Sequence, residues 1–154
     1  MRKVSFDYVS DPPAPEGWLD LDQIAHVAVT SEDPQFPIES AFIPGASGWR
    51  AGGRGEQTIR LTFDPPQRVR RIRLRFVETE TKRTQEFSLQ WRPDRRSPAR
   101  EIVHQQWNFS PQGETTEIED YSVDLDGVGI LELRIDPDIS RRDAVATVAE
   151  WQVA

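Results

Sequence analysis

The chain has 154 residues, of which 19 are lysine or arginine and 26 are aspartate or glutamate, so 19 − 26 leaves a net charge of −7. This length is typical of one domain and allows a hydrophobic core without disulfide bonds. The absence of cysteine excludes a disulfide scaffold, a cysteine-ligated zinc site, an iron–sulfur cluster and a thiol nucleophile. An acidic chain is repelled by nucleic acid and by anionic membranes, so both are secondary candidates as partners.

No segment has the pattern of a signal peptide or of a membrane span. The opening MRKVSFDYVSDPP carries charges and lacks the apolar stretch of about 7–15 residues that a signal peptide needs. The roughly 20 consecutive apolar residues of a membrane-spanning helix occur nowhere in the sequence. We therefore expect a soluble protein located in the cytoplasm.

Residues 1–23 are expected to form an arm in front of one folded domain, residues 24–154. This arm is interrupted by residues that break helices and strands, namely Pro12, Pro13, Pro15 and Gly17. Trp18 and Leu19 are expected to hold the end of the arm against the surface of the domain.

From Ile24 onward apolar and polar residues alternate, which is the period of half-buried β-strands. This alternation predicts strands over residues 59–63, 69–77, 84–91, 101–109, 121–125, 131–135 and 145–153. About eight short strands with short connections favour an antiparallel β-sandwich or barrel. The segment 64–67, Asp-Pro-Pro-Gln, is expected to be a tight connection, and Asp126-Gly127 is expected to be a hairpin turn.

Four of the five tryptophans are predicted to lie in the core. Trp91, Trp107 and Trp151 are in phase with the apolar faces of their strands. Trp49 follows a loop and precedes a strand, a position in which it would seal one end of a sandwich. Trp18 is left unassigned.

No catalytic motif is present in the sequence. Gly45-Ala46-Ser47-Gly48 lacks the glycine two residues after the serine that a nucleophile elbow requires. Gly52-Gly53-Arg54-Gly55 lacks the Lys-Ser/Thr pair of a phosphate-binding loop and is expected to be a flexible loop. His26 and His104 have no metal-ligand partner at a suitable spacing. We therefore expect a protein that is not an enzyme, and a small hydrolase built on two loop carboxylates is the least favoured alternative.

Arginine is unusually frequent, because only Lys3 and Lys82 are lysines and 19 − 2 leaves 17 arginines. Five of them crowd one predicted strand: Arg68, Arg70, Arg71, Arg73 and Arg75. One interpretation is a phosphate-binding or nucleic-acid-binding stripe. The favoured interpretation is a set of cross-strand ion pairs with acids such as Glu86 and Glu132, because the stripe lacks interleaved aromatic residues.

The chain contains the following segments in this order: VAVTSEDPQFPIESAF, a glycine loop, GWRA, QTIRLTFDPPQRVRRIRLRF and finally ATVAEWQV. Over about residues 24–153 this order resembles the discoidin or coagulation-factor type C domains. These domains are galactose-binding-like β-sandwiches, a group that includes many bacterial carbohydrate-binding modules. The resemblance implies an all-β fold, an antiparallel eight-stranded jelly-roll-like sandwich whose loops bind ligands at one end.

The resemblance also implies that the loops at residues 31–37 and 78–83 stand together at that end. The ligand-binding residues that it implies are Glu32, Asp33, Phe36, Arg50, Glu78 and Arg83. The charged side chains would form hydrogen bonds with ligand hydroxyls, and the Phe36 ring would offer an apolar face. For Arg50, a role as a structural clamp is the alternative, and the other residues can equally be ordinary polar loop residues.

Many members of that family hold a structural calcium ion through backbone carbonyls, the aspartate of an Asp-Gly pair and a glutamate near the C-terminus. Glu150 matches this glutamate. The Asp-Gly pair is replaced by Ile43-Pro44-Gly45, so one carboxylate is missing from a site that requires about 6–8 oxygens. We therefore expect no cofactor, with a structural Ca²⁺ at Glu150 as the alternative.

The whole pattern favours a non-catalytic binding module, with carbohydrate as the expected ligand. The alternative is a protein-interaction or scaffold domain of the same fold. A loop pocket with an aromatic floor would favour the first, and a flat apolar or arginine-rich sheet face would favour the second. The oligomeric state is not predicted.

Overall fold

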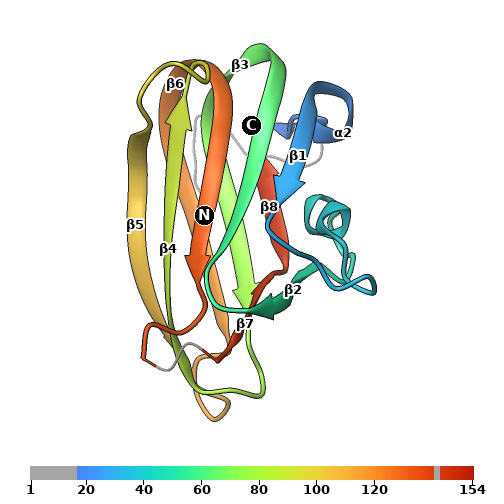
Figure 1. Ribbon diagram of the computed structural model, residues 1–154, viewed down its shortest axis with the longest axis vertical. Helices are drawn as coiled ribbons and strands as arrows, with labels where there is room; N and C mark the ends of the chain where they lie inside the picture. The colour runs from blue at the N-terminus through green and yellow to red at the C-terminus, as the bar shows by residue number, and fades with distance from the viewer. Residues whose placement is uncertain (1–16, 141–142) are drawn as a thin grey trace.

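The computed structural model describes residues 17–140 and 143–154, which form a two-layered β-sandwich (Figure 1). Every pair of neighbouring strands is antiparallel, which confirms the predicted all-β class. The elements in chain order are α2 (Leu21–Ile24), β1 (Ala25–Val29), the 3₁₀ helix η1 (Ile38–Phe42), β2 (Trp49–Arg54), β3 (Gln57–Val77), β4 (Arg83–Arg92), β5 (Arg100–Phe109), β6 (Thr116–Asp136), β7 (Val145–Val148) and β8 (Glu150–Val153).

The two layers are joined because β3 and β6 each pass from one layer into the other. Residues 59–63 of β3 pair with β1, and residues 57–62 pair with residues 130–135 of β6, which in turn pair with β4. Residues 71–77 of β3 pair with residues 116–122 of β6, and β8 pairs with β3 on the other side. Both strands turn over at the upper end in Figure 1.

Two predicted connections are therefore corners inside long strands. Residues 64–67 lie within β3, where the pairing register with β6 shifts. The hairpin turn predicted at Asp126-Gly127 is wrong, because the residues on either side of it pair with β3 and not with each other. Gly127 supplies the positive φ of 72° that this corner of β6 uses.

A short ribbon of β2 and β7 lies at the lower end of the sandwich (Figure 1). Gly52 and Gly53, which were expected in a flexible loop, belong to β2. A Cβ atom on Gly52 would lie 2.9 Å from the Glu32 carbonyl oxygen, so the close approach of the loop before η1 requires glycine there.

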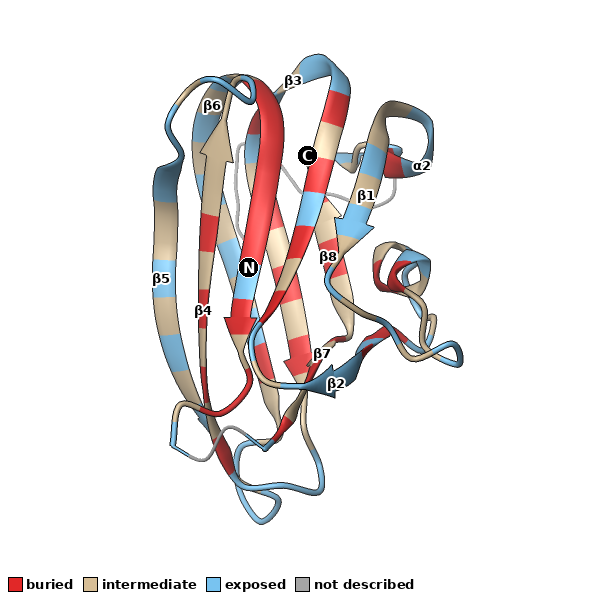
Figure 2. Cartoon of the chain, in the orientation of Figure 1, coloured by how far each residue is buried: buried red, intermediate tan, exposed pale blue. Residues whose placement is uncertain are grey.

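The inward-facing residues of both layers form one continuous core (Figure 2). Trp49 and Trp151 are among the largest fully buried side chains, which confirms their predicted place in the core. Trp91 and Trp107 are only half-buried and pack against the edge of this core. Figure 2 shows the alternation of buried and non-buried residues along β3 and β4 that the sequence pattern predicted.

The predicted arm lies mostly outside the described residues, but its last residues contact the sandwich. The Leu19 amide donates a hydrogen bond of 2.7 Å to the Val153 carbonyl. The Arg71 guanidinium lies 4.7 Å from the centre of the Trp18 ring, a cation–π contact. Among the described residues, no helix is long and apolar enough to cross a membrane.

Four of the five crowded arginines of β3 are matched by acids on neighbouring strands, as the favoured interpretation predicted. Their partners are Asp124 for Arg68, Asp120 for Arg71, and Glu150 for both Arg73 and Arg75. The partners suggested from the sequence were wrong, since Glu132 pairs with Arg60 and Arg134, and Glu86 lies 3.1 Å from His104. The pairs of Arg68 with Asp124 and of Arg71 with Asp120 are exposed and typically contribute about 0–1 kcal/mol each, whereas the two pairs at Glu150 are part-buried.

Candidate functional site

A groove lies where β2, β7 and the β3–β4 loop meet. Figure 1 shows these elements at the lower end of the sandwich. It consists of two adjoining hollows of about 220 and 420 Å³ that share Arg50, Val77 and Thr147. Phe36 lines the first hollow, and residues 78–81 line the second. The two loops that were predicted to stand together therefore border one groove, with Arg50 between them.

The backbone of Arg50 is fixed on both sides, whereas its side chain is exposed. Its amide donates to the Phe36 carbonyl over 3.1 Å, its carbonyl accepts from the Asp33 amide over 2.8 Å, and it lies opposite Thr147 in the ladder with β7. Within residues 17–140 and 143–154, the Arg50 guanidinium has no hydrogen-bond or ion-pair partner. The fold thus presents a cation with unused donors at the centre of the groove.

Glu78 and Arg83 form the base of the β3–β4 loop. The Arg83 Nε atom lies 2.7 Å from one Glu78 oxygen, and the amides of Glu80 and Thr81 donate to the other. Burial raises the pKa of the Glu78 carboxyl, but the hydrogen bonds from Arg83 and from the two amides outweigh it and hold the pKa below its usual value. The Glu78 charge therefore orders this loop.

Only part of the predicted ligand set faces the groove. Phe36, Arg50 and Glu78 line it. The Arg83 side chain is 0% exposed and bonds to Glu78, Gln85 and the Pro137 carbonyl, so the prediction that it contacts a ligand is corrected to a structural role.

The carboxylates of Glu32 and Asp33 bond within their own loop, and a ligand contact for these two residues stays a prediction. One Glu32 oxygen accepts the amide of Ile38 at the start of η1, and one Asp33 oxygen accepts the amide of Gln35. Neither residue lines the groove. Short polar loop residues commonly make such local bonds, which the sequence alone does not distinguish from ligand contacts.

Several groove residues were not predicted. Thr79, Glu80 and Thr81 lie at the tip of the β3–β4 loop, and Thr147 lies on β7. The Thr147 hydroxyl lies 3.4 Å from the Val77 carbonyl, which joins the two sides of the groove. Thr147 could have been found only from the pairing of β7 with β2, which places it opposite Arg50.

A buried polar cluster lies behind the groove at the start of β4 and β6. The Arg83 guanidinium is 4.7 Å from the Phe109 ring centre and donates to Gln85, whose amide lies 3.3 Å from Glu117. Burial and the nearby Glu119 carboxylate raise the pKa of Glu117 to about 9, and the opposing effects of Gln85 and Arg83 are smaller. Glu117 is therefore protonated at neutral pH.

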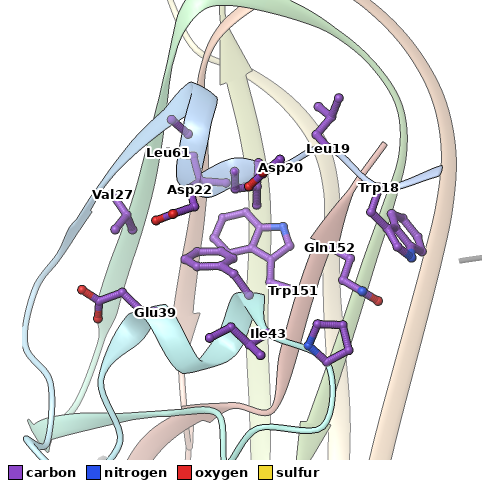
Figure 3. A pocket seen from close by; sticks show the side chains of 14 residues that line it. Trp18, Leu19, Asp20, Asp22, Val27, Glu39, Ile43, Leu61, Trp151 and Gln152 are labelled. Carbon is purple, nitrogen blue, oxygen red and sulfur yellow. The ribbon is translucent and has the colours of Figure 1, made fainter. Parts of the chain in front are cut away.

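A second cavity, of about 560 Å³, lies beside α2, η1 and β8 (Figure 3). The Phe42 and Trp151 rings meet there at 5.8 Å between their centres, and Figure 3 shows Trp151 in the middle of the cavity with Ile43 below it. The acidic residues of its lining are Asp20, Asp22 and Glu39. The Trp18 indole and the Gln152 amide add hydrogen-bond donors to this lining, so the groove differs from the cavity in one respect, the exposed Arg50 guanidinium with its unused donors.

Glu150 does not fit a calcium site. Its carboxylate accepts hydrogen bonds from Arg73 over 3.1 Å and from Arg75 over 3.3 Å. Burial raises the pKa of Glu150, but the two guanidiniums and the Gly45 amide together lower it by more than burial raises it. The carboxylate therefore keeps its charge, which the arginines neutralise. Among the described residues, no group of three or more histidine and acidic side chains could hold a metal ion. The alternative of a metal ligand at Glu150 is therefore corrected to an ion pair.

We expect neither calcium nor a chelator to change the thermal stability. The reason is that the one carboxylate matching the calcium pattern already has two cationic partners. Differential scanning fluorimetry in CaCl₂, in EDTA and in NaCl of matched ionic strength checks this. A rise in Tm with CaCl₂ that EDTA reverses would contradict it.

No protein-family model and no curated protein sequence matches the chain. Solved structures match it over most of its length. The family 32 carbohydrate-binding module of AlyQ, in complex with 4,5-unsaturated mannuronic acid, is 19% identical with a TM-score of 0.60, covering 86% of this chain and 95% of that one. The family 32 module of NanJ from C. perfringens, in complex with galactose, is 17% identical with a TM-score of 0.55, covering 84% and 92%.

A third structure is a family 32 module from a family 31 glycoside hydrolase of Clostridium perfringens, 13% identical with a TM-score of 0.62, covering 90% of this chain and 94% of that one. Likeness at these identities establishes the fold. The chain thus has the sandwich fold of family 32 carbohydrate-binding modules, which confirms the galactose-binding-like, discoidin-type fold that the resemblance implied.

Proposed function

We propose that the protein is a non-catalytic carbohydrate-binding module and that it holds a sugar in the groove around Arg50. The observation that carries the proposal is the exposed guanidinium of Arg50, fixed at its backbone and without a partner among the described residues. The fold shared with modules solved with galactose and other sugars supports it.

The groove offers the chemistry that sugar recognition requires. Sugar hydroxyls donate and accept hydrogen bonds, and the C–H face of the ring packs on an aromatic side chain. Arg50 supplies donors, the Glu80 carboxylate supplies acceptors, and the hydroxyls of Thr79 and Thr81 can do either. The Phe36 ring on the other side of Arg50 supplies an apolar surface. These groups lie on strand ends and an ordered loop, so the groove is largely formed before a ligand arrives.

The Arg50→Ala variant is expected to bind sugar about tenfold or more weakly, because a hydrogen bond to a charged group contributes about 1.5–3 kcal/mol. Its Tm should not change, since the side chain has no partner to lose among the described residues. A glycan array selects the sugar, and calorimetric titration with that sugar measures the affinity. Arg54→Ala, at the other end of β2 and outside the groove lining, is the matched control.

Equal affinity of the Arg50→Ala variant and the wild type would move the site away from the groove. A blank array would reject the sugar proposal itself. The interaction-domain alternative would then lead, and a pull-down from the native host would be the next measurement.

A further inference from the structure

A cluster of arginines lies on the outer face of the layer that contains β1, β4, β5, residues 57–62 of β3 and residues 130–135 of β6. None of the residues around it lines the groove. Arg60 on β3 and Glu132 on β6 are directly opposite each other, and Gln90 on β4 is opposite Glu132 on its other side. Arg134 follows two residues after Glu132 on the same face, and Arg92 lies opposite Ile130. These residues line a hollow of about 80 Å³, which has room for one anionic group and not for a sugar ring. We call Arg60, Arg92 and Arg134 the arginine patch.

Glu132 holds two of these guanidiniums by their Nε atoms. The distances are 2.7 Å from Arg60 Nε and 3.2 Å from Arg134 Nε, and the two arginine side chains remain 45% and 50% exposed. Burial raises the pKa of Glu132, but the hydrogen bonds and charges of Arg60 and Arg134 lower it by more than burial raises it. The carboxylate therefore stays ionised. Bonding through Nε leaves the terminal Nη pair of each guanidinium for another acceptor.

The two arginines that bind Glu150 differ from those at Glu132 in the nitrogen atoms that they use. There one carboxylate also meets two arginines, but Arg73 and Arg75 bind it through Nη atoms and are only 27% and 30% exposed. One terminal nitrogen of each guanidinium is thus used inside that cluster. At Glu132, by contrast, the Nη atoms of Arg60 and Arg134 have no hydrogen-bond or ion-pair partner within the described part of the chain.

The region around the hollow is basic in an acidic protein. The β4–β5 connection and the start of β5 add Arg95, Arg96 and Arg100 against Asp94 and Glu101, and Figure 2 shows much of the connection exposed. With the arginine patch and Glu132, the region has six arginines and three acids, 6 − 3 = +3, so the remainder of the chain carries −7 − 3 = −10. This face therefore attracts an anion more strongly than the acidic remainder of the chain, taken as a whole, does.

We infer that the arginine patch is a second binding surface, which takes the carboxylate or sulfate groups of an acidic polysaccharide. Carboxylate and sulfate oxygens match the forked donors of guanidinium. A polymer with one charge per sugar can place a single group in the hollow, whereas DNA carries one charge per roughly 1.7 Å and would bring many phosphates against the acidic remainder. The surface is separate from the groove, so the inference stands whether or not the groove binds a neutral sugar.

The test is affinity electrophoresis of the full chain in gels containing polygalacturonate, dextran sulfate or neutral dextran. We expect retardation by one or both acidic polymers and none by dextran, and the two acidic polymers distinguish carboxylate from sulfate. The double variant Arg92→Gln/Arg134→Gln leaves the Arg60–Glu132 pair in place, so folding is protected. It should bind about tenfold more weakly, since each lost charged hydrogen bond has a substantial cost.

The matched control is Arg68→Gln/Arg70→Gln, which changes the net charge by the same amount on the other layer. It should alter the affinity less than about twofold, because screened charges at a distance contribute little. An equal loss in both double variants would show mere dependence on net charge and would overturn the inference. Absence of binding to either acidic polymer, or tighter binding to duplex DNA than to both, would also overturn it.

Discussion

Replacing Arg83 by leucine is expected to lower the free energy of unfolding by about 3–5 kcal/mol, the usual cost of removing one partner from a buried ion pair. The Arg83 side chain is 0% exposed and donates to Glu78, Gln85 and the Pro137 carbonyl. Leucine fills much of the space but leaves all three acceptors without this donor. Urea unfolding at pH 7, followed by tryptophan fluorescence, measures the change.

The control for this prediction is Arg95→Leu in the exposed β4–β5 connection, which should change the stability by less than about 0.5 kcal/mol. If the Arg83→Leu variant is as stable as this control, the buried cluster does not support the β3–β4 loop. Sugar binding should also weaken in the Arg83→Leu variant, since Glu78 would lose the partner that fixes it beside Glu80 and Thr81.

Replacing Glu117 by glutamine is expected to raise the free energy of unfolding at pH 7 by about 2–3 kcal/mol. The folded protein keeps Glu117 protonated, with a pKa of about 9 against an ordinary value of 4.5. The contribution of Glu117 to stability is therefore fully present below about pH 4.5 and is lost as the pH rises towards 9. Glutamine resembles the protonated acid, still accepts from Gln85 and takes up no proton on folding.

Unfolding at pH 5, 7 and 9 tests this second prediction. The wild type should lose stability across this range, and the advantage of Glu117→Gln should grow with pH. Glu114→Gln, in the exposed loop before β6, is the control and should follow the wild type. A variant that is less stable than the wild type at pH 9 would show that the ionised carboxylate is needed in the cluster.

The sequence predicts the strands well where one face meets an apolar core. Ile72, Leu74 and Phe76 are all fully buried, as their alternation indicates. The start of β6 was missed because its pattern is inverted, with Glu117 buried and Ile118 53% exposed. The interior at that end is the polar cluster of Arg83 and Gln85, so hydrophobic alternation gives the wrong face.

The continuity of β3 could not be predicted, because proline usually ends a strand. Pro65 and Pro66 instead sit at the corner where β3 leaves one layer for the other. The candidate site was predictable to the level of its loops and of Arg50. Which loop acids face outward depends on hydrogen bonds within each loop, and residue type alone does not determine these.

The passage of β3 and β6 through both layers means that neither layer exists as a separable part. Each layer would lose its central strands if the other were removed, because the two layers share the same two segments of chain. The sandwich therefore has no half that could open alone, be exchanged between two copies or have been acquired as an independent unit. Changes of ligand preference are consequently expected to accumulate in loops and on outer faces, where the shared strands are left intact.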